Sequence, residues 1–126
     1  MVGLCLCALP TASGDEVDVR FSRVGVEQGL SSSWVLAIQR DSRGFLWVGT
    51  QDGLNRYDGR TVVTYRHVPG DPASLPSSVA GALFEDSQQR LWVGSRWSAD
   101  GLALYDRQWD RFVRIAPRLY AWLPAW

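Results

Sequence analysis

An internal repeat restricts the fold of this chain more than any other feature of its sequence. When the segment that starts at Leu30 is laid over the segment that starts at Leu75, Leu46-Trp47-Val48-Gly49 falls on Leu91-Trp92-Val93-Gly94, an offset of 45 residues. A period of this length is typical of repeat architectures, in which each unit buries its apolar surface against the next. The chain is therefore predicted to be an array of similar units.

The second copy of the repeat is slightly longer than the first. Beyond the Trp-Val-Gly string the offset becomes 48, because Tyr57-Asp58 falls on Tyr105-Asp106, so the second copy has gained residues around 96–100. Proteins tolerate insertions in surface loops far better than inside strands or helices. Residues 96–100 are therefore predicted to form a loop.

Each repeat consists of short apolar runs separated by turn-forming residues. The runs are four to seven residues long and rich in Val, Leu, Trp and Tyr, which is typical of β-strands, and no segment has the 3.6-residue period of a helix. We expect four strands joined by tight turns in each repeat. They cover residues 34–40, 45–50, 54–57 and 61–66, and then 79–85, 90–94, 102–105 and 111–115.

The strand expected at residues 45–50 is apolar on both faces. Phe45, Trp47 and Gly49 alternate with Leu46 and Val48, so neither face suits water. A four-stranded meander that is covered on both sides and recurs every 40 to 50 residues is the signature of a β-propeller blade. The predicted fold class is all-β, with two four-stranded antiparallel blades packed face to face. Because closed propellers have about four to eight blades, this propeller is incomplete.

Particular residues of the repeat have predicted structural roles. We expect Trp47 and Trp92 to be buried at equivalent positions, and Gly49 and Gly94 to allow close approach of a neighbouring blade. Aspartates at the turns are expected to hydrogen-bond the turn backbone rather than to form a catalytic carboxylate pair. The residues predicted to form the structural motif of the blades are Asp41, Gly44, Trp47, Gly49, Tyr57 and Asp58, and then Asp86, Trp92, Gly94, Tyr105 and Asp106.

Three strings in the first repeat resemble the two-component regulator propeller repeat: Gly29-Leu30-Ser31-Ser32, residues 41–50 (DSRGFLWVGT) and residues 53–59 (GLNRYDG). The second copy resembles it less closely, since it departs at Gln89-Arg90 and at Ala103-Leu104. The resemblance implies a periplasmic sensor module, usually upstream of a membrane helix and a histidine kinase or diguanylate cyclase. The parent protein would then be anchored in the inner membrane.

Composition excludes several classes of function. The formal net charge is zero, which argues against binding to nucleic acid or to a membrane surface. All 13 basic residues are Arg, so no lysine is available for Schiff-base chemistry or for a nucleotide-binding loop. One His and two Cys are too few for a zinc site or a disulfide framework. We therefore expect no enzymatic activity in this chain, no metal and no cofactor.

The sequence outside the repeats suggests further segments. Residues 1–14 resemble a truncated signal peptide, with an N-terminal strand or a frayed terminus as the alternative. Residues 15–29 are expected to contain a strand, Phe21–Val24, before blade 1 (30–74) and blade 2 (75–115). Residues 116–126 do not resume the repeat. They are expected to be either the scar of a truncation or frameshift, or an ordinary tail.

The predicted function is an extracytoplasmic ligand-sensing module, present here as a fragment without a catalytic domain. Its expected partners are a small extracytoplasmic ligand and further blades of the parent chain. The loop residues Arg96 and Trp97 are candidate ligand contacts, since a guanidinium and an indole suit acidic or sugar-like ligands; alternatively, Trp97 covers the edge of its blade. His67 is expected to be a solvated loop residue. The alternative function is a propeller scaffold for protein–protein interaction, and a propeller enzyme would need catalytic residues in other blades.

Overall fold

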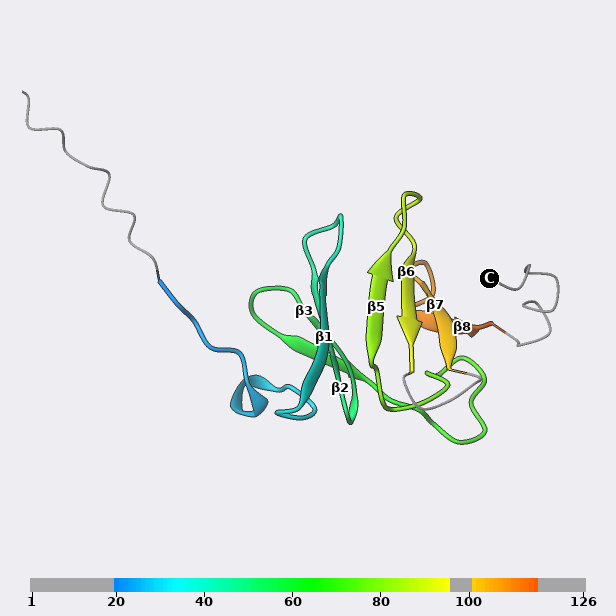
Figure 1. Cartoon of the computed structure of the whole chain (residues 1–126), viewed down its shortest axis with the longest axis horizontal. Helices are drawn as coiled ribbons and strands as arrows, with labels where there is room; N and C mark the ends of the chain where they lie inside the picture. Colours follow the sequence, from blue (N-terminus) through cyan, green and yellow to red (C-terminus); the bar gives the residue numbers. More distant parts are fainter. Residues whose placement is uncertain (1–19, 96–100, 116–126) are drawn as a thin grey trace, which may run out of the picture.

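Two four-stranded antiparallel sheets make up the computed structural model, which describes residues 20–95 and 101–115 (Figure 1). In each sheet the strands lie in sequence order, as in a meander. The fold class predicted from the repeat is confirmed. Blade 1 comprises β1 (Val35–Arg40), β2 (Leu46–Thr50), β3 (Gly53–Tyr57) and β4 (Val62–Tyr65); blade 2 comprises β5 (Ala82–Glu85), β6 (Leu91–Gly94), β7 (Leu102–Asp106) and β8 (Arg111–Arg114).

The segment before blade 1 corrects one expectation. Phe21–Val24 is not a strand, and the side chain of Phe21 is exposed. A strand needs a partner for its backbone hydrogen bonds, and the sheet of blade 1 ends at β1. A short 3-10 helix, Val26–Gln28, follows instead, and no helix among the described residues is long and apolar enough to cross a membrane. The expected leader and tail, residues 1–14 and 116–126, lie outside the described residues.

The first hairpin of each blade turns through a residue with left-handed backbone geometry. In blade 1 this residue is Gly44, with a φ of 90°, and in blade 2 it is Gln89, with a φ of 61°. Only glycine adopts this geometry without steric cost. The departure of the second repeat at Gln89 therefore changes the residue but keeps the turn.

The hydrophobic core lies between the two blades. Blade 1 contributes Trp47 and Leu54, both fully buried. Opposite them lie side chains from blade 2 and from the connection that precedes it: Leu75, Ala80, Leu91, Val93, Ala103, Tyr105 and Phe112. The rings of Trp47 and Tyr105 meet edge to face at 4.8 Å between centroids, a favourable arrangement for aromatic pairs.

Gly49 lies where the backbone just before β5 comes close to blade 1. A Cβ atom built on Gly49 would collide with the carbonyl oxygen of Ala80. In the same place the backbone N–H of Ala80 donates to the carbonyl oxygen of Thr50, at 3.0 Å. Gly94, the counterpart in blade 2, has no such neighbour, because the nearest atom to its Cβ would be the Cβ of Ala82 at 3.3 Å in its own sheet.

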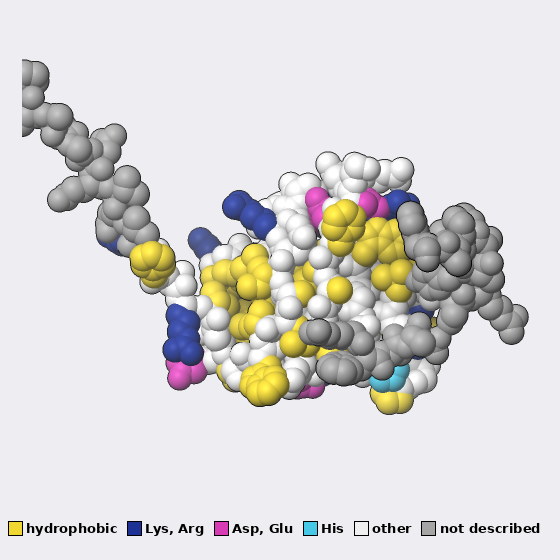
Figure 2. Space-filling view, in the orientation of Figure 1, with side chains coloured by type: hydrophobic (Ala, Val, Ile, Leu, Met, Phe, Trp, Pro, Cys, Tyr) yellow, Lys and Arg dark blue, Asp and Glu magenta, His cyan; other side chains and the backbone are white. Residues whose placement is uncertain are grey.

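The two repeat tryptophans differ in burial, which corrects the prediction that both are buried. Trp47 is fully buried, whereas Trp92 is only half-buried. Trp47 faces blade 2, but the equivalent face of blade 2 is not covered by another blade among the described residues. The difference therefore follows from the position of each blade in the array. Figure 2 shows hydrophobic side chains gathered on the surface of the two blades.

Candidate functional site: the seam between the blades

Asp41 forms the centre of the first polar group between the blades. Its carboxylate is fully buried and accepts hydrogen bonds at Oδ1 from the backbone N–H groups of Arg43 and Phe45, at 3.0 and 2.9 Å. At Oδ2 it accepts from Nε1 of Trp47 and from Nη1 of Arg107, both at 2.8 Å. Burial alone would raise the pKa of Asp41, but the hydrogen bonds from Trp47, Arg107 and Phe45 outweigh it and lower the pKa below its ordinary value.

Arg107 connects the two blades. It lies in the turn between β7 and β8 of blade 2 and reaches Asp41 of blade 1, while its Nη2 donates to Oε2 of Glu85 at 3.0 Å. Glu85 in turn accepts from the backbone N–H of Ser42, at 3.0 Å to Oε2. Two charged residues of blade 2 thus hold the first hairpin of blade 1 by charge-assisted hydrogen bonds.

The equivalent aspartate of blade 2 obtains its partners from its own blade. Asp86 accepts at Oδ1 from the backbone of Gln88 and Arg90, and at Oδ2 from Nε of Arg90 and Nε1 of Trp92, at 2.6 and 2.9 Å. Desolvation opposes ionisation, but these bonds outweigh it and lower the pKa of Asp86. Asp86 therefore has a cationic partner without a residue from a further blade.

Arg56 forms the centre of the second polar group. Its guanidinium carbon lies 5.2 Å from the ring centroid of Phe45 and 5.8 Å from those of Trp47 and Tyr65, within the range of cation–π interaction. Its Nη1 donates to the hydroxyl of Tyr105 in blade 2, at 2.7 Å. An arginine of blade 1 is thus enclosed by aromatic rings and bonded across the seam.

Asp110 completes this second group from the turn before β8. Its Oδ1 accepts from the hydroxyls of Tyr65 and Tyr105, at 2.6 Å each, and lies 3.5 Å from Nη1 of Arg56. Burial and the bond to Asp110 raise the pKa of both tyrosines. Desolvation raises the pKa of Asp110, but the two hydroxyl donors and the charge of Arg56 outweigh this effect and lower the pKa. The group therefore holds a carboxylate and two neutral phenols at neutral pH.

The remaining motif aspartates, Asp58 and Asp106, lie directly before the turns that lead to the fourth strand of each blade. Asp58 accepts at Oδ1 from the backbone N–H groups of Arg60 and Thr61, at 2.8 and 2.7 Å, and Asp106 accepts from the backbone of Gln108 at 3.1 Å. These bonds fix the turns between the third and fourth strands of each blade. Tyr57 donates its hydroxyl to the carbonyl oxygen of Gly59, at 2.8 Å, in the same turn of blade 1.

The turn after β2 lies beside the connection between the two blades. Arg66 donates to the carbonyl oxygen of Asp52 at 3.0 Å, so the turn after β2 and the connection that starts at His67 lie together. His67 is half-buried rather than solvated, because its Nδ1 lies 2.8 Å from the carbonyl oxygen of Leu75.

The candidate ligand contacts Arg96 and Trp97 lie outside the described residues. No cluster suited to a metal ion occurs within 20–95 and 101–115.

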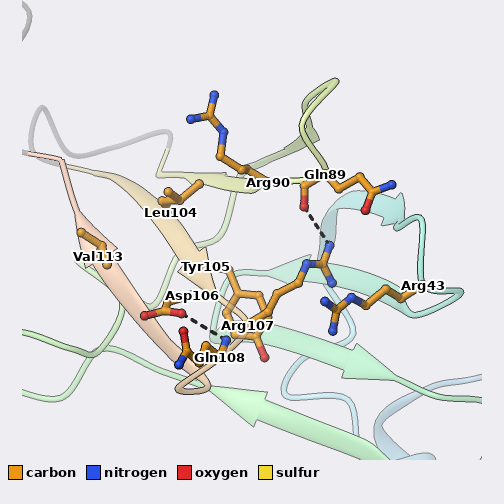
Figure 3. A pocket seen from close by; sticks show the side chains of 9 residues that line it. All are labelled: Arg43, Gln89, Arg90, Leu104, Tyr105, Asp106, Arg107, Gln108 and Val113. Atoms are coloured by element: carbon orange, nitrogen blue, oxygen red, sulfur yellow. Dashed lines mark hydrogen bonds between the residues drawn. The ribbon is translucent and has the colours of Figure 1, made fainter.

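A shallow hollow of about 560 Å³ lies beside the seam (Figure 3). In Figure 3 the guanidinium of Arg107 reaches toward the backbone carbonyl of Gln89, a contact of 3.4 Å. Two of the three arginines that line the hollow are paired with carboxylates, Arg107 with Asp41 and Arg90 with Asp86. The third, Arg43, is exposed. The residues that line the hollow are Arg43, Gln89, Arg90, Leu104, Tyr105, Asp106, Arg107, Gln108 and Val113.

Four residues of the seam were missed by reasoning from the sequence: Arg56, Glu85, Arg107 and Asp110. None of them repeats between the two copies; the counterpart of Arg107, for example, is Gly59. A comparison of what differs between the repeats, rather than of what they share, would have pointed to them. Each of these four residues is specific to one blade and bonds a residue of the other.

Comparisons with known proteins agree with the repeat. The model of the two-component regulator propeller matches residues 29–52 and 74–97. Histidine kinase P4 of Formosa agariphila is 53% identical over 47 residues, which are 37% of this chain and 3% of that protein. The extracellular domain of a hybrid two-component system from B. thetaiotaomicron is 24% identical, with a TM-score of 0.42 over 82% of this chain and 21% of that one. The chain thus spans only a small part of these relatives. The two repeats of this chain are thus similar to the repeat of the two-component regulator propeller.

Proposed function

We propose that this chain is part of the extracytoplasmic sensor region of a two-component or diguanylate cyclase signalling protein, in which further blades complete the propeller. The observation that carries this proposal is the match of both repeats to the two-component regulator propeller model. Residues 1–14, which resemble a truncated signal peptide, support the extracytoplasmic location. The kinase or cyclase domain would lie elsewhere in the parent protein.

A sensor must convert binding into a change of arrangement, and the seam offers a physical means. The contacts of Arg107 with Asp41 and of Arg56 with Tyr105 each join one blade to the other. A ligand that binds one arrangement of the blades more tightly than another would shift the population toward it. Binding of equal affinity to both arrangements would transmit no signal. The blades would therefore act as relatively rigid bodies that pass a displacement to the domains after them.

The extracytoplasmic location of the blades is tested with a fusion to alkaline phosphatase, an enzyme that is active only after export. The phosphatase is fused to the longest reading frame that contains this chain. We expect phosphatase activity when the fusion point lies directly after blade 2. Activity of a cytoplasmic reporter at the same point, with an inactive phosphatase, would contradict the proposal and favour the scaffold function. A fusion that has lost its signal sequence is the control for background activity.

The ligand contact is tested in the parent protein. Arg96 can offer charge-assisted hydrogen bonds and Trp97 a stacking surface, and the first repeat does without this insertion. The double variant Arg96→Ala/Trp97→Ala should therefore reduce the signalling response at least about tenfold, the effect of losing one good contact, without unfolding the blade. The matched control is Arg60→Ala, in an exposed turn of blade 1. An undiminished response of the double variant would exclude these residues as contacts.

A further inference from the structure

The connection between the two blades is folded into a compact loop, residues 67–78. The loop closes on itself, because the backbone N–H of His67 donates to Oγ of Ser78 at 3.1 Å. It is attached to the last strand of blade 2, since the backbone N–H of Phe112 donates to the carbonyl oxygen of Ala73 at 2.9 Å. Compact surface loops whose ends lie close together often carry functional residues.

Arg114, at the end of β8, holds this loop through neutral oxygen atoms. Its Nε donates to the carbonyl oxygen of Ser74 at 3.1 Å, and its Nη2 donates to the carbonyl oxygens of Asp71 and Leu75, at 2.9 and 3.2 Å. These bonds fix the position of the guanidinium. Its Nη1 donates to no other residue in the described part of the chain, so two N–H groups of a rigid cation remain available there.

The charge of Arg114 is not paired with a carboxylate of any described residue. The acidic residue of the loop, Asp71, uses its Oδ1 to accept from the backbone N–H of Ala73 at 2.9 Å, and it forms no ion pair with Arg114. Other arginines of the two blades do reach carboxylates: Arg56, Arg66, Arg90, Arg107 and Arg111. Arg114 therefore differs from them in lacking a negative partner.

Blade 1 shows that attachment of such a segment needs no cation. The place of Arg114 in the sheet, opposite Ala103, is taken in blade 1 by Thr64, opposite Asn55. The segment before blade 1 is held by Asn55, which accepts from the backbone N–H of Ser31 at 3.0 Å and donates from Nδ2 to Oγ of Ser31 at 2.9 Å. Because a neutral side chain is enough there, the positive charge of Arg114 points to a further role.

Arg114 lies where neighbouring blades do not cover it. Its partner Ala103 belongs to the core between the blades, so Arg114 is on the face of blade 2 toward blade 1, yet it is exposed. A further blade against the opposite face would leave it accessible. The base of the longer loop of the second repeat, where the backbone N–H of Ser95 donates to the carbonyl oxygen of Gly101, lies at the same end of the sheet, since β7 starts and β8 ends there.

We propose that Arg114, with His67 beside it, binds an oxyanion: a carboxylate, sulfate or phosphate group of a small ligand. A guanidinium donates parallel N–H groups to the oxygens of such a group, and a guanidinium that is already fixed loses little conformational entropy on binding. Nδ1 of His67 lies 3.4 Å from Nη2 of Arg114, and an anion at this place favours the imidazolium form, in which both ring nitrogens donate. This inference rests on the proposed sensor function and gives the class of its ligand.

The experiment is an NMR titration of the full chain with acetate, sulfate or phosphate, at constant pH and at an ionic strength kept constant with chloride. His67 is the only histidine of the chain, so its ring C–H signals are unambiguous and report on the contact with Arg114. We expect these signals to shift and to reach saturation. The anion that saturates at the lowest concentration distinguishes a carboxylate from a tetrahedral oxyanion. Shifts that do not saturate, or that chloride reproduces, would overturn the proposal.

Variants assign the binding to Arg114. Arg114→Gln should weaken it at least about tenfold, because a charge-assisted contact is lost. Arg111→Gln is the matched control, since Arg111 lies on the same strand and pairs with Asp106 at its other end. It should leave the titration unchanged. Equal binding by the two variants would overturn the assignment.

A second variant covers the case in which Arg114→Gln releases the loop, which the backbone amide signal of Ser74 reports. Arg114→Lys keeps the charge but loses the planar fork of N–H groups, so it should bind the anion more weakly than the natural chain. Binding as tight as that of Arg111→Lys would contradict the proposal. The phosphatase fusion tests the location of the blades separately, so the failure of one proposal is distinguishable from the failure of the other.

Discussion

At the scale of single residues, one aspartate–tryptophan pair recurs in both blades, yet its surroundings differ. Asp41 and Asp86 each accept from the indole N–H of the tryptophan six positions later. The turn role of these aspartates could be predicted from the sequence, because an aspartate at the start of a hairpin commonly bonds the turn backbone. The pairing of Asp41 with Arg107 could not, because the partner lies 66 positions away in a turn that the first repeat builds differently.

Removal of Arg107 should destabilise the chain by about 2–3 kcal/mol, since it leaves a buried carboxylate without its cation while three other hydrogen bonds remain. The change is Arg107→Ala, and the measurement is the urea midpoint at a fixed chain concentration. Arg43→Ala is the control, because Arg43 is exposed and contributes only its backbone N–H to Asp41. Equal midpoints for the two variants would show that the bridge contributes nothing to stability.

Stability should also depend on pH in the acid range. The pKa values of Asp41 and Asp110 are lowered in the folded chain, so the unfolded chain binds protons first as the pH falls. The stability from these groups is complete above the ordinary pKa of 3.8 and is lost as the pH falls through the lower folded values. We expect urea midpoints that are level near neutral pH and decrease below about pH 4. Asp41→Asn should flatten this decrease, and a midpoint that rises with acid would contradict the assignment.

At the scale of elements, the strands could be predicted and their connections to neighbours could not. Each of the eight expected strands is present, with ends that differ by up to three residues, because alternation and turn residues are local signals. Phe21–Val24 forms no strand and Phe21 is exposed, because a strand there would need the last blade of a closed ring as its partner, and no such blade lies among the described residues. The unequal burial of Trp47 and Trp92 likewise depends on what lies beyond the blade.

Two glycines at equivalent positions should respond differently to the same change. Gly49→Ala would place a methyl group against the backbone carbonyl of Ala80, which cannot move without opening the seam. We expect a loss of about 1–3 kcal/mol in the free energy of unfolding, as for other overpacked sites. Gly94→Ala is the matched control and should cost clearly less, because the added Cβ would meet only the Cβ of Ala82 at 3.3 Å. The measurement is urea unfolding of both variants. Similar losses in the free energy of unfolding would show that the close approach at Gly49 does not matter for stability.

At the scale of the whole molecule, a two-blade array has one covered core and two faces that a closed propeller would bury. The buried aromatic and aliphatic residues gather between the blades, while Phe84 and Ile38 remain exposed on opposite sides of the pair. An array of this kind is expected to be less stable alone than as part of a larger stack, because terminal repeats normally need a polar outer face. Its behaviour in solution should therefore change with chain concentration.

A dye that fluoresces on apolar surfaces measures directly how much of these faces is exposed. The full chain should bind the dye on the face of blade 2 that carries Phe84 and Val113, and the double variant Phe84→Ser/Val113→Ser should reduce the signal by removing two exposed apolar side chains. Val68→Ser, in the loop before blade 2, should leave the signal unchanged. A soluble monomer that binds no dye and unfolds in one sharp thermal transition would contradict the view that these faces require a partner.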